Sequence, residues 1–171
     1  GVPVARMLSA MWSEMYDRVK ADHSERYNGK IVDVFLCWGG HAGGEQRFDV
    51  MIEKQIKKSV NTIYIYDINS FTDPVEKARE VAHEYGHAEL PAIGGYAAPE
   101  GWANGYLGEK LFLKWLSEGL ADGRLTTEDS MGATKERIDA WLAAHEQPLV
   151  IAAAQTFPSA ALLKDTSAPG M

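Results

Sequence analysis

Apolar residues near the start of the chain recur at three- and four-residue spacing, with polar residues between them. This period matches one face of an α-helix, so the sequence predicts a helix over residues 3–22. The apolar stripe is rich in methionine, and we expect it to pack against a sheet. Its members are Val4, Met7, Leu8, Met11, Trp12, Met15, Tyr16 and Val19.

Two later segments have the patterns of β-strands. Residues 31–38 form a short apolar run, which predicts a buried strand. Residues 62–68 alternate aliphatic residues with polar or aromatic ones, which predicts a strand with one buried face. Tyr64 and Tyr66 would share the other face of that strand and could line a cleft.

The segment between these strands is harder to interpret. Residues 39–44 are rich in glycine but lack the spacing and the Gly-Lys-Ser/Thr ending of a phosphate-binding loop, so we expect a flexible connection in which His41 is exposed. Residues 46–59 place several apolar side chains on one helical face, and this pattern predicts a helix. Those positions are Phe48, Met51, Ile52, Gln55 and Ile56.

The second half of the chain reads as helical. Asp73 has the character of an N-cap, Pro74 suits the first helical position, and Glu76 completes a capping-box pattern, so a helix is expected from Pro74 to about Leu90. Pro91 ends it.

Two more helices are expected after this one. The first runs over residues 99–120. The second starts near residues 126–129 and carries an apolar stripe, and the Ser-Ala-Pro-Gly ending of the chain is expected to be loose. The stripe consists of Met131, Ile138, Trp141, Leu142 and His145.

Composition limits the classes of function. The chain has 171 residues, 46% of them hydrophobic, which suits a single domain with a real core over residues 1–171. A net charge of -7 with scattered basic residues disfavours nucleic acid as a partner, and no apolar run is long enough for a membrane span. Cys37 is the only cysteine, which excludes an internal disulfide and a four-cysteine zinc site. Because the chain begins at Gly1, we expect a trimmed or mature form and slightly favour a secreted or cell-envelope location.

The pattern His-Glu-x-x-His at residues 83–87 carries the strongest chemical signal. Two histidines four residues apart on a helix lie one turn apart on the same face, so both rings can reach one cation. Neutral imidazole suits zinc, and a catalytic zinc commonly has three protein ligands and one water. Glu84, beside His83, is then placed to take a proton from that water. Gly86 lacks a side chain between the two histidines, which allows another element to pack close to the metal.

A third ligand is needed, and helix geometry ranks the candidates. Glu109 is the only carboxylate on its stripe of the helix over residues 99–120, and a lone carboxylate facing a core is costly unless a cation compensates it. Glu100 and Glu118 fall on the opposite face together with Asn104, and Glu118 has the spacing of a solvated pair with Lys114. We therefore predict Glu109, with Glu118, Glu100, Glu89 and His145 as alternatives. The other residues on its stripe are Trp102, Gly105, Tyr106, Phe112, Leu113, Leu116 and Leu120.

The motif followed by a glutamate on the next helix resembles the gluzincin metallopeptidases, which include thermolysin and the zinc aminopeptidases. Twenty-one residues separate His87 from Glu109, and residues 106–109 (Tyr-Leu-Gly-Glu) are similar to the Trp-Leu-Asn-Glu segment of the aminopeptidases. Residues 115–121 match that segment more closely in letters but at longer spacing, nearer that of bacterial collagenases. The metzincins do not match, because Leu90 and Ile93 occupy the positions of their glycine and third histidine.

The resemblance covers about residues 60–121 and implies an α+β, zincin-like fold. It implies an upper lobe, about residues 1–90, with a small twisted sheet and the active-site helix, and a helical lower lobe, about residues 91–171. A cleft between the lobes would hold the metal. The strand at 62–68 would pair with an extended peptide substrate.

The expected function is a zinc-dependent peptidase with His83, His87 and Glu109 as metal ligands and Glu84 as general base. The developing oxyanion needs a donor, for which Tyr106 and Tyr96 are candidates. Two alternatives stay open: a zinc-containing domain of a larger protein that binds or scaffolds without turnover, and a zinc hydrolase acting on non-peptide amides.

Overall fold

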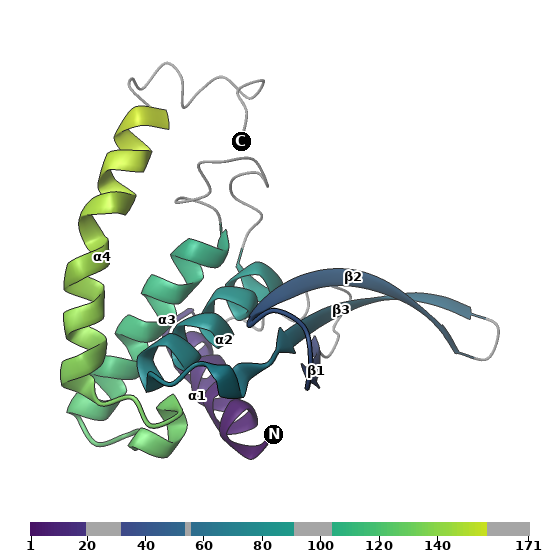
Figure 1. Ribbon diagram of the computed structural model, residues 1–171, viewed down its shortest axis with the longest axis horizontal. Helices are drawn as coiled ribbons and strands as arrows, with labels where there is room; N and C mark the ends of the chain where they lie inside the picture. Colours follow the sequence, from purple (N-terminus) through teal and green to yellow (C-terminus); the bar gives the residue numbers. More distant parts are fainter. Residues whose placement is uncertain (20–31, 54–55, 91–103, 157–171) are drawn as a thin grey trace.

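The computed structural model of the protein describes residues 1–19, 32–53, 56–90 and 104–156 (Figure 1). In this part of the chain the architecture is α+β, with four α-helices and a three-stranded mixed sheet. The elements in order are α1 (Val2–Val19), β1 (Val32–Cys37), β2 (Gly43–Glu53), β3 (Ile56–Tyr66), the 3-10 turn η2 (Ile68–Ser70), α2 (Pro74–Glu89), α3 (Asn104–Ala121), the 3-10 turn η3 (Thr127–Ser130) and α4 (Lys135–Thr156).

The sheet has the strand order β1-β3-β2. β1 runs parallel to β3, and β2 runs antiparallel to it, so β3 is the central strand. Ile63 pairs with Val34 of β1 on one side and with Gln46 of β2 on the other. β2 and β3 extend beyond the helices as a long two-stranded ribbon (Figure 1).

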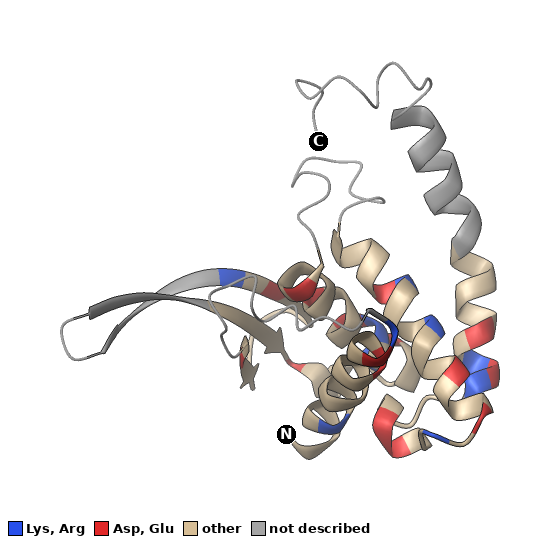
Figure 2. Ribbon diagram, turned by 180° about the vertical axis from the view of Figure 1, so that it is seen from behind, with Lys and Arg blue, Asp and Glu red and all other residues tan. Residues whose placement is uncertain are grey.

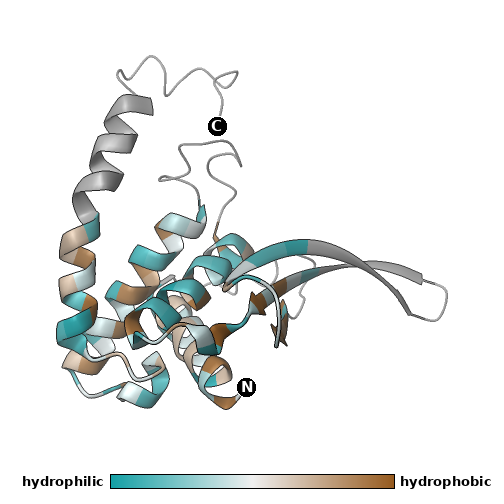
Figure 3. Cartoon of the chain, in the orientation of Figure 1, coloured by the Kyte–Doolittle hydropathy of each residue, from teal (hydrophilic) through white to brown (hydrophobic). Residues whose placement is uncertain are grey.

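Two sequence predictions about the strands are wrong. Residues 46–59, predicted to be helical, belong to the β2–β3 hairpin. Phe48, Val50 and Ile52 also alternate along the sequence, so this short apolar pattern fits the period of a strand as well as that of a helix. Antiparallel pairing with β3 makes the segment a strand. Residues 32–37 of the run predicted at 31–38 do form a strand, mostly apolar (Figure 3), but β1 pairs only with β3 among the described strands and is half-buried, with Phe35 50% exposed.

The other predicted elements agree with the structure where it describes them. The strand predicted at 62–68 is confirmed over residues 62–66, although β3 begins earlier, at Ile56, and Ile68 lies in η2. Ile63 and Ile65 are buried, and Tyr64 and Tyr66 lie on the opposite face with their rings stacked. α2 begins at Pro74 as predicted. The start predicted near residue 99 for the following helix lies outside the described residues, and α3 ends at Ala121.

The last predicted helix is divided in two. A capping box at Thr126 and Asp129 starts only the short turn η3. Met131 then adopts a left-handed conformation, and Gly132 follows with φ of 90°. These two residues turn the chain, and α4 begins after them at Lys135. The capping signal was therefore correct, but the element that it starts is a single turn.

A single hydrophobic core joins α1, β3, α2, α3 and α4, so the predicted upper and lower lobes share their buried residues. The sequence predicts that α1 packs on a sheet, but its most extensive contacts are with η3, α3 and α2. Its methionines fill this helical interface, where flexible thioether side chains suit irregular gaps. The largest fully buried side chains include Met7, Met11, Met15, Ile63, Ile65, Phe112, Leu113, Leu116 and Ile138.

Basic residues lie among acidic ones on the surfaces of the helices (Figure 2). Arg6 of α1 pairs with Asp129 in η3, and Arg137 of α4 pairs with Asp73 at the start of α2. Within the described ranges, no helix combines the length and apolarity that crossing a bilayer would require.

Candidate metal centre

The helix that carries the motif begins where the sequence places it. The Asp73 carboxylate accepts a hydrogen bond from the Val75 backbone N–H at 2.9 Å, and Pro74 occupies the first turn. The expected capping-box contact of Glu76 is replaced by side-chain contacts, because its carboxylate accepts from Arg79 Nε at 2.9 Å and Trp141 Nε1 at 3.1 Å. Asp73 therefore caps α2, and Glu76 ties α2 to α4.

The two motif histidines face each other through their Nε2 atoms. These atoms lie 3.1 Å apart, with the ring planes at 79° to one another. Two nitrogen ligands of a tetrahedral zinc, each at 2.0–2.1 Å, lie about 3.3 Å apart. The pair of Nε2 atoms on His83 and His87 therefore fits one zinc ion with little movement.

The Nδ1 atoms of both rings point toward oxygen atoms on α3. Asn104 Oδ1 lies 2.7 Å from His87 Nδ1, and Asn104 Nδ2 donates to the His87 backbone carbonyl at 3.4 Å. Glu109 Oε2 lies 3.5 Å from His83 Nδ1, which is longer than a hydrogen bond. The helix following the motif thus supplies an oxygen on the outer side of each ring.

Glu109 is buried, as the sequence predicts, with 3% of its surface exposed. The cation that compensates it in the structure is Arg79, whose Nη1 lies 3.0 Å from Glu109 Oε2. Arg79 also contacts Glu76 and Glu80, and these carboxylates keep the pKa of its guanidinium raised despite burial. Whether Glu109 also binds the metal stays a prediction.

The histidine next to this cluster has a perturbed protonation equilibrium. Burial alone would lower the pKa of His83, because a charged ring loses its hydration. The neighbouring carboxylates of Glu109, Glu84 and Glu80 more than offset that effect, so the pKa of His83 is raised. The site is therefore electronegative around the ring, which favours a bound cation.

Glu84 is held against the first residues of β2. Its side chain is buried, with 3% of its surface exposed, and its Oε2 atom has no hydrogen-bond partner among the described residues. A Cβ atom on Gly44 would lie 2.5 Å from Glu84 Cγ, so the strand can approach only because Gly44 has no side chain. Burial raises the pKa of Glu84 to about 7, although the nearby His83 opposes this effect.

Three glycines bring the backbones of α2 and α3 into contact. A Cβ atom on Gly86 would lie 2.6 Å from Asn104 O, and one on Gly108 would lie 2.4 Å from Gly86 Cα. A Cβ atom on Gly105 would lie 2.4 Å from His87 Nε2 and 2.6 Å from His83 Nε2. The sequence interpretation of Gly86 as a point of close approach is confirmed, and Gly105 places α3 directly beside the two donor nitrogens.

The other candidate residues lie at different places. The Tyr106 ring meets the His83 ring edge-on, with centroids 4.7 Å apart. Glu118 forms its ion pair with Arg18 of α1 at 2.7 Å, not with Lys114 as expected. His145 is exposed, and its Nδ1 lies 2.7 Å from the Trp141 carbonyl. Glu100 and Tyr96 are outside the described residues.

Sequence reasoning missed Arg79 and Asn104. Arg79 stands four residues before His83, so it shares the motif face one turn earlier, and this spacing was a usable signal. Asn104 was assigned to the face opposite Glu109. It reaches His87 because it opens α3 at the helix crossing, which sequence periodicity does not predict.

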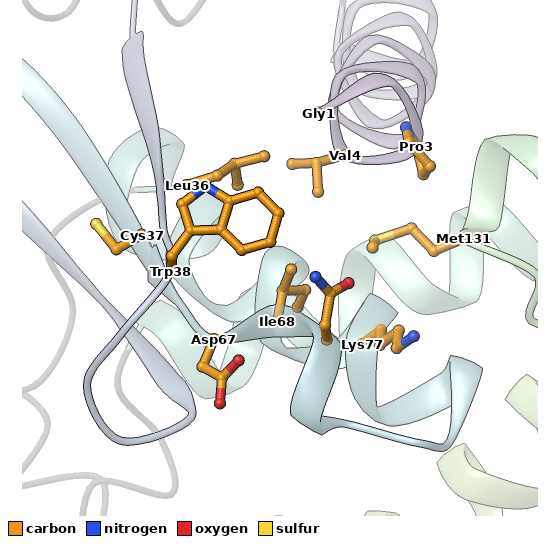
Figure 4. A pocket seen from close by; sticks show the side chains of 11 residues that line it. Gly1, Pro3, Val4, Leu36, Cys37, Trp38, Asp67, Ile68, Lys77 and Met131 are labelled. Atoms are coloured by element: carbon orange, nitrogen blue, oxygen red, sulfur yellow. The ribbon is translucent and has the colours of Figure 1, made fainter.

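The described residues do not form a complete set of metal ligands. Within these ranges, no three His, Cys, Asp or Glu side chains are grouped so that they could hold one metal ion. A separate cavity of about 390 Å³ is lined by residues of α1, the end of β1 and the start of α2, including Val4, Trp38 and Lys77 (Figure 4), and by none of the predicted site residues.

The predicted substrate strand must also be corrected. β3 is paired on both sides over residues 61–66, so the prediction that residues 62–68 offer a free edge to a peptide is wrong. Among the described strands, β2 is the edge strand that lies next to α2, and its Gly44 contacts Glu84. If a strand edge recognises an extended ligand, β2 is the one beside the motif.

Comparisons with known proteins give no relatives: no family model, no curated protein and no solved structure matches the chain. Any functional conclusion therefore depends on the residues and on their geometry.

Proposed function

We propose that this protein is a zinc-dependent peptidase. The observation that carries the proposal is the pair of Nε2 atoms 3.1 Å apart on His83 and His87, beside the buried carboxylate of Glu84. A zinc ion bound by these rings would acidify water and polarise a scissile carbonyl.

Glu84 is the proposed general base. It follows His83 directly in the chain, and its buried position against Gly44 limits the directions in which its carboxylate can point. Its role is to accept a proton from water at the site and to pass that proton to the leaving amine. Its Oε2 atom has no hydrogen-bond partner among the described residues, which supports its availability to accept a proton.

The proposed substrate is an extended peptide lying along the edge of β2 that pairs with no other described strand. Backbone groups on such an edge can pair with the backbone of a ligand, which gives affinity without a fixed side-chain requirement. Tyr106, whose ring contacts His83, is the proposed donor to the oxyanion that develops on the scissile carbonyl.

A second candidate function is zinc binding without turnover. Two histidine donors are brought together, which supports metal binding, but no group of three ligand-type side chains is assembled among residues 1–19, 32–53, 56–90 and 104–156. A catalytic zinc generally has three protein ligands. The third would then have to come from a side-chain movement or from outside these ranges, where the sequence alternative Glu100 lies.

The proposal is tested with Glu84→Gln, which keeps the shape of the side chain and removes its basicity. We expect the variant to bind zinc as the wild type does and to lose cleavage of a peptide library followed by mass spectrometry. Glu136→Gln is the matched control, because Glu136 is exposed on α4, and it should retain full activity. Full activity of Glu84→Gln would refute the assignment of the base, and zinc binding by a wild type that cleaves no peptide would favour the second candidate.

A further inference from the structure

Each motif histidine has a different kind of neighbour at each of its two ring nitrogens. The Nε2 atoms face each other at 3.1 Å, whereas each Nδ1 faces a side-chain oxygen from α3. Asn104 Oδ1 lies 2.7 Å from His87 Nδ1, and Glu109 Oε2 lies 3.5 Å from His83 Nδ1. The two oxygens come from the same helix, and each lies on the Nδ1 side of its ring.

An oxygen at Nδ1 determines which nitrogen can bind a metal. A neutral imidazole carries one proton, and an acceptor at Nδ1 keeps the proton there, so that Nε2 presents its lone pair. The Asn104 amide has a fixed orientation for this purpose, because its Nδ2 donates to the His87 carbonyl and its Oδ1 therefore faces the ring. Asn104 is placed as an acceptor for the His87 N–H.

Glu109 occupies the corresponding place beside His83. His83 Nδ1 is buried and has no hydrogen-bond partner among the described residues, and Glu109 Oε2 is the acceptor within ion-pair distance of it. Arg79 Nη1 holds the same Oε2 atom at 3.0 Å. A shift of a few tenths of an ångström would close the contact to a hydrogen bond of ordinary length.

The part of α3 nearest the donor nitrogens carries no ligand. Gly105 lies between Asn104 and Glu109 in the chain, and it is the residue whose Cβ position would touch both Nε2 atoms. A side chain there has no room, so α3 approaches the metal position with backbone only. The side-chain oxygens of Asn104 and Glu109 lie beside the Nδ1 atoms of the two rings instead.

We infer that Glu109 is a positioning residue for His83, as Asn104 is for His87, and that it is not the third metal ligand. This inference rests on the proposed zinc site, and it replaces the ligand role that the sequence predicts for Glu109. In this arrangement α3 sets the tautomer and direction of both rings, and the third ligand is supplied from another part of the chain or by solvent.

The substitutions Glu109→Gln and Glu109→Leu separate the two roles. Glutamine retains an oxygen that can accept from His83 Nδ1 and from Arg79, but an amide oxygen is a poor ligand for zinc. If Glu109 positions His83, the glutamine variant keeps nearly the wild-type affinity for Zn²⁺, and the leucine variant loses about 10- to 100-fold. If Glu109 is a ligand, both variants lose affinity steeply. Competition with a chromophoric chelator measures these affinities.

A spectroscopic readout is independent of activity and of small changes in stability. In protein loaded with Co²⁺ alone, the visible absorption bands report the atoms bound to the metal. The inference predicts that Glu109→Gln leaves the band positions unchanged. A shift of those bands would show that the carboxylate had been in the coordination shell, and would overturn the inference.

The tautomer of His87 provides a third measurement on the metal-free protein, in which the 3.1 Å contact between the two Nε2 atoms requires one of them to carry a proton. Long-range 1H–15N NMR spectra should show the proton of neutral His87 on Nδ1, opposite Asn104 Oδ1, with its Nε2 accepting from His83. In Asn104→Leu, the proton of His87 should no longer be confined to Nδ1, because the acceptor is lost. Asn104→Asp restores an acceptor oxygen and should return the proton to Nδ1. An unchanged His87 signal in Asn104→Leu would contradict the positioning role of α3.

The outcomes distinguish this inference from the proposed function. If the wild type binds no Zn²⁺, or if His83→Ala and His87→Ala bind it as well as the wild type, the proposed function fails and the inference fails with it. If zinc binding depends on both histidines and Glu109→Gln loses as much affinity as Glu109→Leu, only the inference fails. If Glu109→Leu does not fold, the zinc affinity and the Co²⁺ spectrum of Glu109→Gln still show whether Glu109 is a metal ligand.

Discussion

Gly105 determines how closely α3 can approach the two motif histidines. Because it lacks a side chain, its backbone reaches a position from which a Cβ atom would lie within 2.6 Å of both Nε2 atoms. Real Cβ atoms do not tolerate such distances, so either the rings or the helix must move when a methyl group is added. The space beside the two Nε2 atoms therefore depends on Gly105 having no side chain.

We predict that Gly105→Ala weakens zinc binding more than tenfold, because the methyl group displaces at least one ring from its place beside the other. Isothermal titration with Zn²⁺ measures the change. Gly39→Ala is the control, because a Cβ atom at Gly39 meets nothing within 4 Å. Equal zinc affinity in Gly105→Ala and the wild type would show that the two Nε2 atoms do not form the binding site.

At the scale of elements, the crossing of α2 and α3 builds the site. Gly86 and Gly108 allow the two backbones to touch, and this contact brings Asn104 and Glu109 of one helix to His87 and His83 of the other. Each glycine costs about 1 kcal/mol relative to alanine in a helix. The close crossing offsets that cost by packing the two helices around the motif.

Gly108→Ala should destabilise the fold by about 1–3 kcal/mol, because its methyl group would meet the α2 backbone and has no flexible neighbour to displace. An isolated helix would gain stability from the same change. Urea unfolding followed by circular dichroism distinguishes these signs. A variant as stable as the wild type would mean that the backbones of α2 and α3 do not come into contact at Gly108.

The elements around the motif could be predicted from the sequence, and the contacts between them could not. The Asp73–Pro74 start signal and the helical spacing located α2 correctly, and the stripe analysis found that Glu109 is buried. The hairpin at residues 46–59 was missed because its apolar residues fit two periods. Arg79 as the partner of Glu109 depends on how α2 and α3 cross, and no local pattern determines a crossing.

At the scale of the whole molecule, α1 is joined to the rest of the chain by core packing and by polar contacts, among them a cluster with η3. Arg6 Nη2 donates to Asp129 Oδ1 at 3.0 Å, and Asp129 Oδ2 accepts from the Thr126 backbone N–H at 2.8 Å. Burial raises the pKa of Asp129, but the hydrogen bonds from Thr126 and Arg6 outweigh it, and the net pKa is lowered. The carboxylate is therefore stabilised in the folded state.

This cluster should make stability depend on pH. A carboxyl group whose pKa is lower when folded contributes stability above its unfolded pKa of about 3.9, and that contribution is lost as the pH falls through the folded pKa. We predict that Asp129→Asn costs about 1 kcal/mol at neutral pH, the size of a helix-cap contact. The difference between variant and wild type should shrink below about pH 4, as urea unfolding at several pH values would show. A difference that stayed constant with pH would contradict the assignment.

The central claim is that one zinc ion is bound between His83 and His87. Equilibrium dialysis of the purified protein against Zn²⁺, followed by metal analysis, tests it most directly when the wild type is compared with His83→Ala and His87→Ala. The account predicts one tightly bound zinc per chain in the wild type and loss of that zinc in each variant. Absence of bound zinc in the wild type, or equal binding in all three proteins, would contradict it.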